Sequence, residues 1–272
     1  KPDKFEVVFI SWVNSLRDNN IDKEVIAIDG KTIRGSKDSF HKKSAIHIVS
    51  AWANNNQLVL GQRKVDGKSN EITAIPELLE MLDIKGSIVT IDAMGTQKNI
   101  AKVIIDNQAN YILALKGNQT YLKEDIENLC KQMKPDSENE VVEKGHGRIE
   151  TRNCKVYNQI HLLEDLEKWS DLKSVIQITS EREINEKKTN ETRLYISSLN
   201  DEAEAFNKYI RMHWGVENSL HWTLDMTFRE DEQRKRDKNS AQNFAIVRKI
   251  VLNLLKQEDS KKLSLRTKRL KA

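Results

Sequence analysis

The sequence predicts an α/β protein whose mixed sheet is flanked by helices, and three observations support this class. The segments 25–29 and 88–92 are runs of apolar and β-branched residues, as in strands that are covered on both faces. Apolar residues recur at helical spacing between and after these runs. From 135 to 200, β-branched alternation with little helical period predicts a β-rich insertion rather than an independent domain.

The order of the predicted elements in the first half indicates a particular fold. An amphipathic helix is expected at 5–18, where large apolar residues lie on one side. Strands are expected at 25–29, 45–52, 57–64, 87–92 and 111–115, and helices at 71–82 and 96–107. Ser69 or Asn70 is expected to cap the first of these two helices. Three successive strands followed by alternating helix and strand match the order of the ribonuclease H-like fold.

The second half is expected to contain more strands and then helices. A loop is predicted at 135–140, followed by strands at 149–157, 173–181 and 191–199. Helical spacing returns at 201–226 and 239–257. In the last of these segments an apolar stripe predicts the buried face, made of Phe244, Val247, Ile250, Val251 and Leu254.

These elements predict five parts along the chain. They are an N-terminal helix at 1–20 that is the remnant of a larger N-terminal region, a first part of the ribonuclease H-like core at 21–134, the β-rich insertion at 135–200, helices that complete the core at 201–258, and a basic tail at 259–272. The tail carries basic residues and no acid between 260 and 272, which suits either phosphate contacts or a solvated terminus.

Composition favours a folded protein with a heavily charged surface. Charged residues make up 32% of the 272 residues and hydrophobic residues 38%, and no stretch approaches the ~20 apolar residues of a membrane helix. The two cysteines, Cys130 and Cys154, have no metal-ligand spacing, so a reducing cytoplasm is expected. A net charge of +4 does not by itself indicate a nucleic-acid partner.

Three acids are candidates for a metal site. Asp29 and Asp92 each end a strand-like run, and Glu217 is expected on a largely apolar helix face with His213 and His221. Carboxylates that meet at strand ends repel one another unless a divalent cation lies between them. Metal-assisted phosphoryl transfer is therefore the leading hypothesis.

Simpler interpretations of the same residues stay open. Each aspartate would also suit an Asx-turn after a strand. The two histidines could be core residues or ion-pair partners of Glu217, and a zinc site is disfavoured because no cysteine lies nearby. Lys31 and Arg34, in the segment that follows Asp29, could hold phosphates beside a metal.

Several segments together resemble one family of proteins. They are Ile26-Ala27-Ile28-Asp29-Gly30-Lys31-Thr32-Ile33-Arg34-Gly35, Thr90-Ile91-Asp92-Ala93-Met94, Ala114-Leu115-Lys116-Gly117-Asn118-Gln119, His146-Gly147-Arg148-Ile149-Glu150-Thr151-Arg152 and 213–222. In combination they resemble bacterial insertion-sequence transposases of the ISAs type, which include the H-repeat-associated proteins. The resemblance implies a DDE transposase with a ribonuclease H-like core and a β-rich insertion before the helix that bears the glutamate.

The resemblance also implies roles for individual residues. Asp29, Asp92 and Glu217 would be the catalytic acids and would hold Mg²⁺, with Mn²⁺ as a substitute. DNA-binding residues are expected within the matching motifs, at Lys31, Arg34, Lys116, Asn118, His146, Arg148, His213 and Asn218. The wider group often has a tyrosine, an arginine and a lysine around its glutamate. Here Ile210, His213 and Leu224 stand in those places, so that phosphate-holding set is absent or rearranged.

The expected reaction is in-line attack on a DNA phosphodiester, first by water and then by the freed 3′-hydroxyl. Double-stranded DNA is the expected partner, both as element ends and as target, and a homodimer on DNA is plausible because two ends must be held together. Two alternatives stay open: a ribonuclease H-like nuclease without strand transfer, and an inactive, domesticated DNA-binding remnant.

Overall fold

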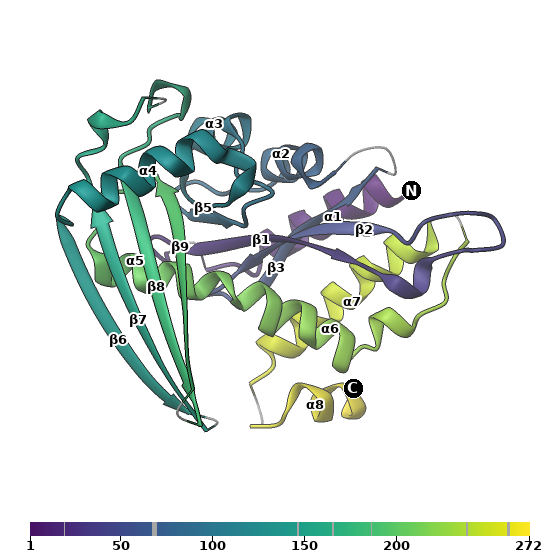
Figure 1. Ribbon diagram of the computed structural model, residues 1–272. Coiled ribbons are helices and arrows are strands. Elements are labelled where there is room, and N and C mark those ends of the chain that lie inside the picture. Colours follow the sequence, from purple (N-terminus) through teal and green to yellow (C-terminus); the bar gives the residue numbers. More distant parts are fainter. Residues whose placement is uncertain are drawn as a thin grey trace. The chain divides into compact units, whose positions relative to one another are not determined.

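The computed structural model describes residues 1–18, 20–66, 70–145, 147–164, 166–185, 187–237, 239–259 and 262–272. The chain forms two compact units. Unit 1 consists of residues 1–87 and 213–272, and unit 2 consists of residues 88–212. Each unit combines strands with helices (Figure 1), which confirms the predicted α/β class with a mixed sheet flanked by helices.

Unit 1 is built on three antiparallel strands in the order β3-β2-β1. These are β1 (Val25–Thr32), β2 (His47–Ala53) and β3 (Leu58–Val65). The helices α1 (Pro2–Asn14) and α2 (Glu71–Met81) pack against β3. Asn70 caps α2, because its side chain accepts a hydrogen bond from the Ile72 backbone N–H, as predicted; Ser69, the other predicted cap, lies outside the described residues.

The C-terminal part of unit 1 is helical but irregular. The helix α5 (Ala203–His213) leads into it, followed by a π-helical segment, η5 (Val216–His221), and by α6 (Trp222–Met226). A 3-10 turn, η6 (Glu230–Glu232), precedes α7 (Ser240–Gln257) and α8 (Leu265–Lys271). The sequence predicted one helical stretch at 201–226. The π segment interrupts it, because a π turn contains one residue more than an α turn and shifts every later side chain around the axis.

The buried face of α7 differs from the predicted one. Phe244, Val247 and Leu254 are exposed, whereas Lys249 and Asn253 are buried. β3 lies at the edge of the sheet, and its outer backbone groups need partners. The Asn253 side chain supplies them, since it accepts from the backbone N–H of Val59 and donates to its carbonyl oxygen. The predicted apolar stripe was wrong because hydrogen bonding to an edge strand, and not apolar burial alone, sets the orientation of this helix.

Unit 2 contains a mixed sheet in the order β4-β5-β9-β8-β7-β6. The short strands β4 (Ile88–Ile91) and β5 (Asn110–Leu115) are parallel, and the antiparallel strand β9 (Lys187–Ser197) pairs with β5. The remaining strands are β8 (Ser174–Ile184), β7 (Arg148–Tyr157) and β6 (Ser137–Gly145). Its α-helices among the described residues are α3 (Lys98–Asp106), α4 (Thr120–Gln132) and α5 without its last residue.

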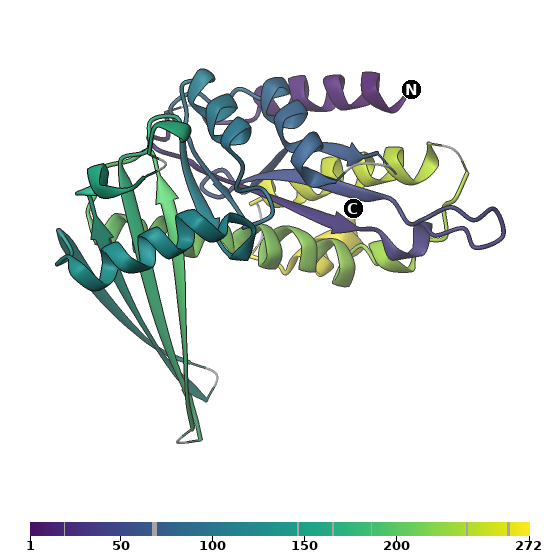
Figure 2. The same cartoon turned by 45° about the horizontal axis from the view of Figure 1, so that its top comes forward.

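The four strands β6 to β9 form the β-rich segment of unit 2 and run side by side in both views (Figure 1, Figure 2). The predicted loop at 135–140 was wrong in part, because β6 begins at Ser137. Glu138 and Glu140 on β6 are exposed, and the charged and polar run at 136–140 resembles a loop in the sequence. Among the described residues, no helix has the length and apolar character needed to cross a membrane.

Candidate active site

The candidate site in unit 1 begins on strand β1. Asp29 was predicted to end this strand. It lies instead within the strand, opposite Ser50, and β1 continues to Thr32. The Asp29 side chain is 24% exposed, and its Oδ2 lies 3.3 Å from Nδ1 of His221 on the π-helical segment. The His221 side chain is 13% exposed. The structure thus brings the segment that carries Glu217 against the strand that carries Asp29.

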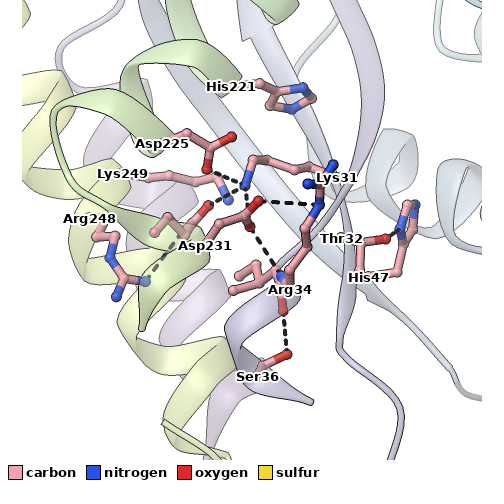
Figure 3. Close-up of polar contacts among 12 residues, drawn as sticks. Lys31, Thr32, Arg34, Ser36, His47, His221, Asp225, Asp231, Arg248 and Lys249 are labelled. Carbon is pink, nitrogen blue, oxygen red and sulfur yellow. Dashed lines mark hydrogen bonds and ion pairs between the residues drawn. The ribbon is translucent and has the colours of Figure 1, made fainter. Parts of the chain in front are cut away.

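Lys31 lies two residues further along β1 and is surrounded by acids (Figure 3). Its Nζ is 2.7 Å from Asp225 Oδ1, 3.1 Å from Asp231 Oδ1 and 3.5 Å from Glu230 Oε2. Burial alone would lower the pKa of Lys31, but the hydrogen bond to Asp225 and the charge of Glu230 outweigh it and raise this pKa. Lys31 is therefore held as a cation inside unit 1, with its side chain 13% exposed.

The two contacts, Asp29 with His221 and Lys31 with Asp225, have matching spacings. Residues two apart on a strand share one face and lie about 6.6 Å apart along it. Residues four apart on a helix also share a face, with a rise of about 6 Å. Strand and helix therefore meet at two polar contacts in register. This pairing fixes how α6 and the end of the π segment lie along β1.

A buried polar network continues behind Lys31 toward α7 (Figure 3). Arg248 NH1 lies 3.3 Å from Glu230 Oε1, and both side chains are at most 10% exposed. Lys249 donates a 2.7 Å hydrogen bond to Gln62 Oε1. Burial lowers the pKa of Lys249 to about 8, although the charge of Glu230 acts in the opposite direction.

Glu217 lies within the π-helical segment and is exposed. The sequence had suggested that it would be buried on an apolar stripe, and this was wrong. The helical count that placed it there assumed 3.6 residues per turn through 210–224, and the π turn changes that phase. Val216 is buried beside it, and Leu220, which the same count put on the stripe, is buried as predicted. π turns often occur at functional sites, and here one turns a carboxylate outward.

Asp92 follows β4 in unit 2. Its Oδ1 accepts backbone hydrogen bonds from Met94 (3.1 Å) and Gly95 (3.3 Å), which is an Asx-turn of the kind that the sequence left open. Asn118 donates a 2.6 Å hydrogen bond to the carbonyl oxygen of Ala93. The turn after β5 is thereby joined to the turn after β4, as expected for the carboxyl ends of neighbouring parallel strands.

The other predicted site residues have different surroundings. Arg34 begins a 3-10 turn, η1 (Arg34–Ser36), and its side chain is 85% exposed with Nε 3.5 Å from Asp231 Oδ2. Lys116 and Asn218 are exposed, His213 ends α5, and Arg148 NH2 lies 3.5 Å from Glu150 Oε2. His146 lies outside the described residues.

Sequence reasoning missed the role of His221 as the partner of Asp29, and it missed Asp225 altogether. The signal was present, because Asp29 and Lys31 are two residues apart on a strand while His221 and Asp225, which contact them, are four residues apart. These two spacings predict a contact only when β1 and this helix are already known to be neighbours.

The three predicted acids are hard oxygen donors of the kind that Mg²⁺ prefers, so the donor set fits this ion chemically. Asp29 and Glu217 belong to unit 1 and Asp92 to unit 2. Within the ranges that the structure describes, no three histidine, cysteine, aspartate or glutamate side chains are grouped closely enough to hold a metal ion.

Comparison with known proteins identifies a family and several relatives. Residues 20–254 match the model of the transposase DDE domain, a range that includes all three acids. The chain is 47% identical to the protein named "Putative transposase YncI" of Escherichia coli O157:H7, over 93% of this chain and 66% of that protein. It is 44% identical to "H repeat-associated putative transposase YhhI" of Escherichia coli (strain K12), over 100% of this chain and 74% of that protein.

The chain thus spans about two thirds to three quarters of the length of these relatives. A solved S-adenosylmethionine-dependent methyltransferase from Clostridium acetobutylicum ATCC 824 aligns with 48% of each chain at 12% identity, with a TM-score of 0.17.

Proposed function

Because the chain belongs to the family of transposase DDE domains, we propose that it cuts and joins DNA phosphodiester bonds by metal-dependent phosphoryl transfer. The observation that carries this proposal is the contact of His221 with Asp29, which brings the glutamate-bearing segment against the aspartate-bearing strand within unit 1. A ribonuclease H-like core is the expected fold for this chemistry, and the order of the first five strands agrees with it.

Asp29, Asp92 and Glu217 are the residues proposed to hold Mg²⁺, or Mn²⁺ as a substitute. When bound, these ions activate the attacking hydroxyl and stabilise the leaving oxygen. His221 is a positioning residue in this proposal, because its Nδ1 contact with Oδ2 fixes the orientation of the Asp29 carboxylate. The Asx-turn does the same for Asp92, since two backbone N–H groups hold its Oδ1.

The other residues predicted to contact DNA divide into two groups. Lys31 is surrounded by three carboxylates, and we assign it to the support of the α6 and η6 segments rather than to DNA. Arg34, Lys116, Asn118, Arg148, His213 and Asn218 are proposed as DNA contacts, as is His146. Contacts to phosphates position DNA without reading its sequence. Double-stranded DNA is the proposed substrate, and a homodimer that holds two ends is the proposed assembly in the cytoplasm.

The proposal is tested by nicking of supercoiled plasmid in Mg²⁺ or Mn²⁺. We expect Asp29→Asn and Asp92→Asn to abolish nicking, because each removes a charged metal ligand with little change in shape. Their thermal unfolding should match that of the original chain. Asp106→Asn is the matched control, since this acid is exposed on α3 and pairs with Lys102, and it should retain full activity. Metal-dependent nicking in either site variant would refute the assignment.

A second assay separates this function from the alternatives. DNA ends with a free 3′-hydroxyl are incubated with a target plasmid, and joined products are measured. Joining identifies a transposase, whereas nicking without joining identifies a nuclease. DNA binding that EDTA does not affect, with no cleavage in any metal, would identify a binding remnant.

A further inference from the structure

An exposed aromatic residue lies at the end of the loop that connects β1 and β2, residues 33–46, here called the β1–β2 loop. Phe40 is 89% exposed. The loop nevertheless has defined structure, because Asp38 and Lys43 exchange two backbone hydrogen bonds of 3.0 and 2.8 Å. In both views this loop projects from the strands of unit 1 (Figure 1, Figure 2). Phe40 is thus presented to solvent on a closed turn.

The surroundings of Phe40 are basic. Lys37, Lys42 and Lys43 are exposed. Asp38, the acid of this loop, is 7% exposed and is bound to His41, since its Oδ1 accepts from the His41 backbone N–H and its Oδ2 lies 2.7 Å from His41 Nδ1. The outward side of the loop therefore combines one aromatic ring with three lysines. The His41 ring packs edge-on against Phe40, with 4.9 Å between ring centroids.

A second basic segment, residues 233–237, lies beside the loop. Arg34 donates its backbone N–H to Asp231, and a Cβ on Gly35 would lie only 2.4 Å from the Gln233 carbonyl oxygen. The hydrogen bond from His41 lowers the pKa of Asp38, and the charge of Arg236 adds to this effect. Arg234 and Arg236 are exposed, as is one acid, Asp237. The two segments form one surface of unit 1 with an excess of positive charge.

We propose that the β1–β2 loop and residues 233–237 form a DNA-binding surface on which Phe40 stacks on an unpaired base while the lysines and arginines hold the adjoining phosphates. This inference rests on the proposed function. Proteins that hold single strands combine a basic groove with aromatic rings, because phosphates require cations and every base has a π-face. A protein partner fits this surface poorly, since the cores of such interfaces are depleted in lysine.

The test is DNA binding in EDTA, measured by fluorescence anisotropy with a blunt duplex and with the same duplex carrying an unpaired overhang. The original chain should bind the overhang DNA more tightly. Phe40→Ala should weaken overhang binding by about 5- to 100-fold, as expected for the loss of one stacked base, and should leave blunt-duplex binding nearly unchanged. Phe40→Trp should restore the preference. Tyr121→Ala is the matched control, because Tyr121 is 87% exposed on α4 of unit 2 and should have no effect.

A lysine variant tests the phosphate contacts. Lys42→Gln with Lys43→Gln should weaken binding of both DNAs equally and reduce the slope of log affinity against log salt by about 1 to 2. Phe40 and both lysines are exposed, so these variants should keep the unfolding temperature of the original chain.

The possible results separate this inference from the proposed function. Equal binding by Phe40→Ala and the original chain would overturn the inference and leave the proposed function standing. Failure of the original chain to bind any DNA would overturn both. A loss of overhang preference in Phe40→Ala, with nicking by the acid variants still abolished, would support both.

Discussion

Lys31 gives the clearest energetic prediction for a single residue. Its Nζ lies within 3.5 Å of three carboxylates, of which Glu230 is 2% exposed, so Lys31→Met removes one of the cations that face this buried acid. Breaking a buried ion pair costs about 3 to 5 kcal/mol, and the lower value applies here because Asp225 and Asp231 are partly exposed. We expect the free energy of unfolding to fall by about 3 kcal/mol in urea denaturation.

Lys102→Met provides the control for that experiment. Lys102 and Asp106 form an ion pair on α3 with both side chains more than half exposed, and such pairs contribute about 0.3 to 0.5 kcal/mol. An equal loss of unfolding free energy in Lys31→Met and Lys102→Met would show that the acids around Lys31 do not need its charge to be stable.

The sequence places the candidate acids along the chain better than it identifies their partners. Asp29 and Asp92 were selected because each follows a run of strand-forming residues; Asp29 lies within β1 and Asp92 directly follows β4. The contact of Asp29 with His221 joins residues far apart in the chain. It depends on which helix packs on which strand, and local spacing does not contain that information.

At the scale of single elements, Gly215 marks the start of the π-helical segment. A Cβ there would lie 2.0 Å from Asn54 Oδ1 and 3.1 Å from Trp52 Nε1. Asn54 is 8% exposed and donates to the Val25 carbonyl oxygen, so it cannot move without losing that bond. We expect Gly215→Ala to lower the free energy of unfolding by roughly 1 to 2 kcal/mol, after the better helix propensity of alanine is included.

Gly117→Ala is the matched control, because a Cβ at Gly117 would meet nothing within 4 Å. Thermal unfolding of the two variants tests the packing of the π segment against β2. A gain in stability in Gly215→Ala would show that this contact does not restrain the segment.

Elements whose apolar residues follow a single strand or helix spacing were predicted well. Elements whose orientation also depends on polar contacts were not. The strands of unit 1 and α2 lie within a few residues of their predicted positions. The orientation of α7 was predicted wrongly because Asn253 and Lys249 bond to β3, and a hydrophobic stripe cannot reveal such a demand. The π turn left no local signal that a count of helical steps could detect.

For the whole molecule, Lys249 predicts how stability depends on pH. Its pKa is about 8 in the folded protein and about 10.4 in an unfolded chain. Between these values the unfolded state holds a proton that the folded state has released. The free energy of unfolding should therefore rise from pH 8 to 10.4, by up to about 3 kcal/mol.

Urea denaturation of the original chain and of Lys249→Met across this pH range measures the effect. The difference in stability between the two should change with pH in the stated direction and level off below pH 8. A constant difference would mean that Lys249 keeps its ordinary pKa and that water reaches it in the folded state.

The division into two units was also beyond sequence reasoning. Unit 1 combines the first 87 residues with the last 60. The spacing of apolar residues predicts helices and strands, but it does not show which distant segments of the chain pack together. Of the three predicted acids, Asp29 and Glu217 belong to unit 1 and Asp92 to unit 2.

The hydrogen bonds from Asn253 to Val59 affect how copies of this protein can associate. An open strand edge can be extended by a strand of another chain, and repeated extension leads to polymers. Here a helix side chain occupies both backbone groups of Val59, so a second chain cannot continue the sheet at that point without displacing α7. In the homodimer proposed to hold two DNA ends, the contact between copies would therefore lie away from Val59 of β3.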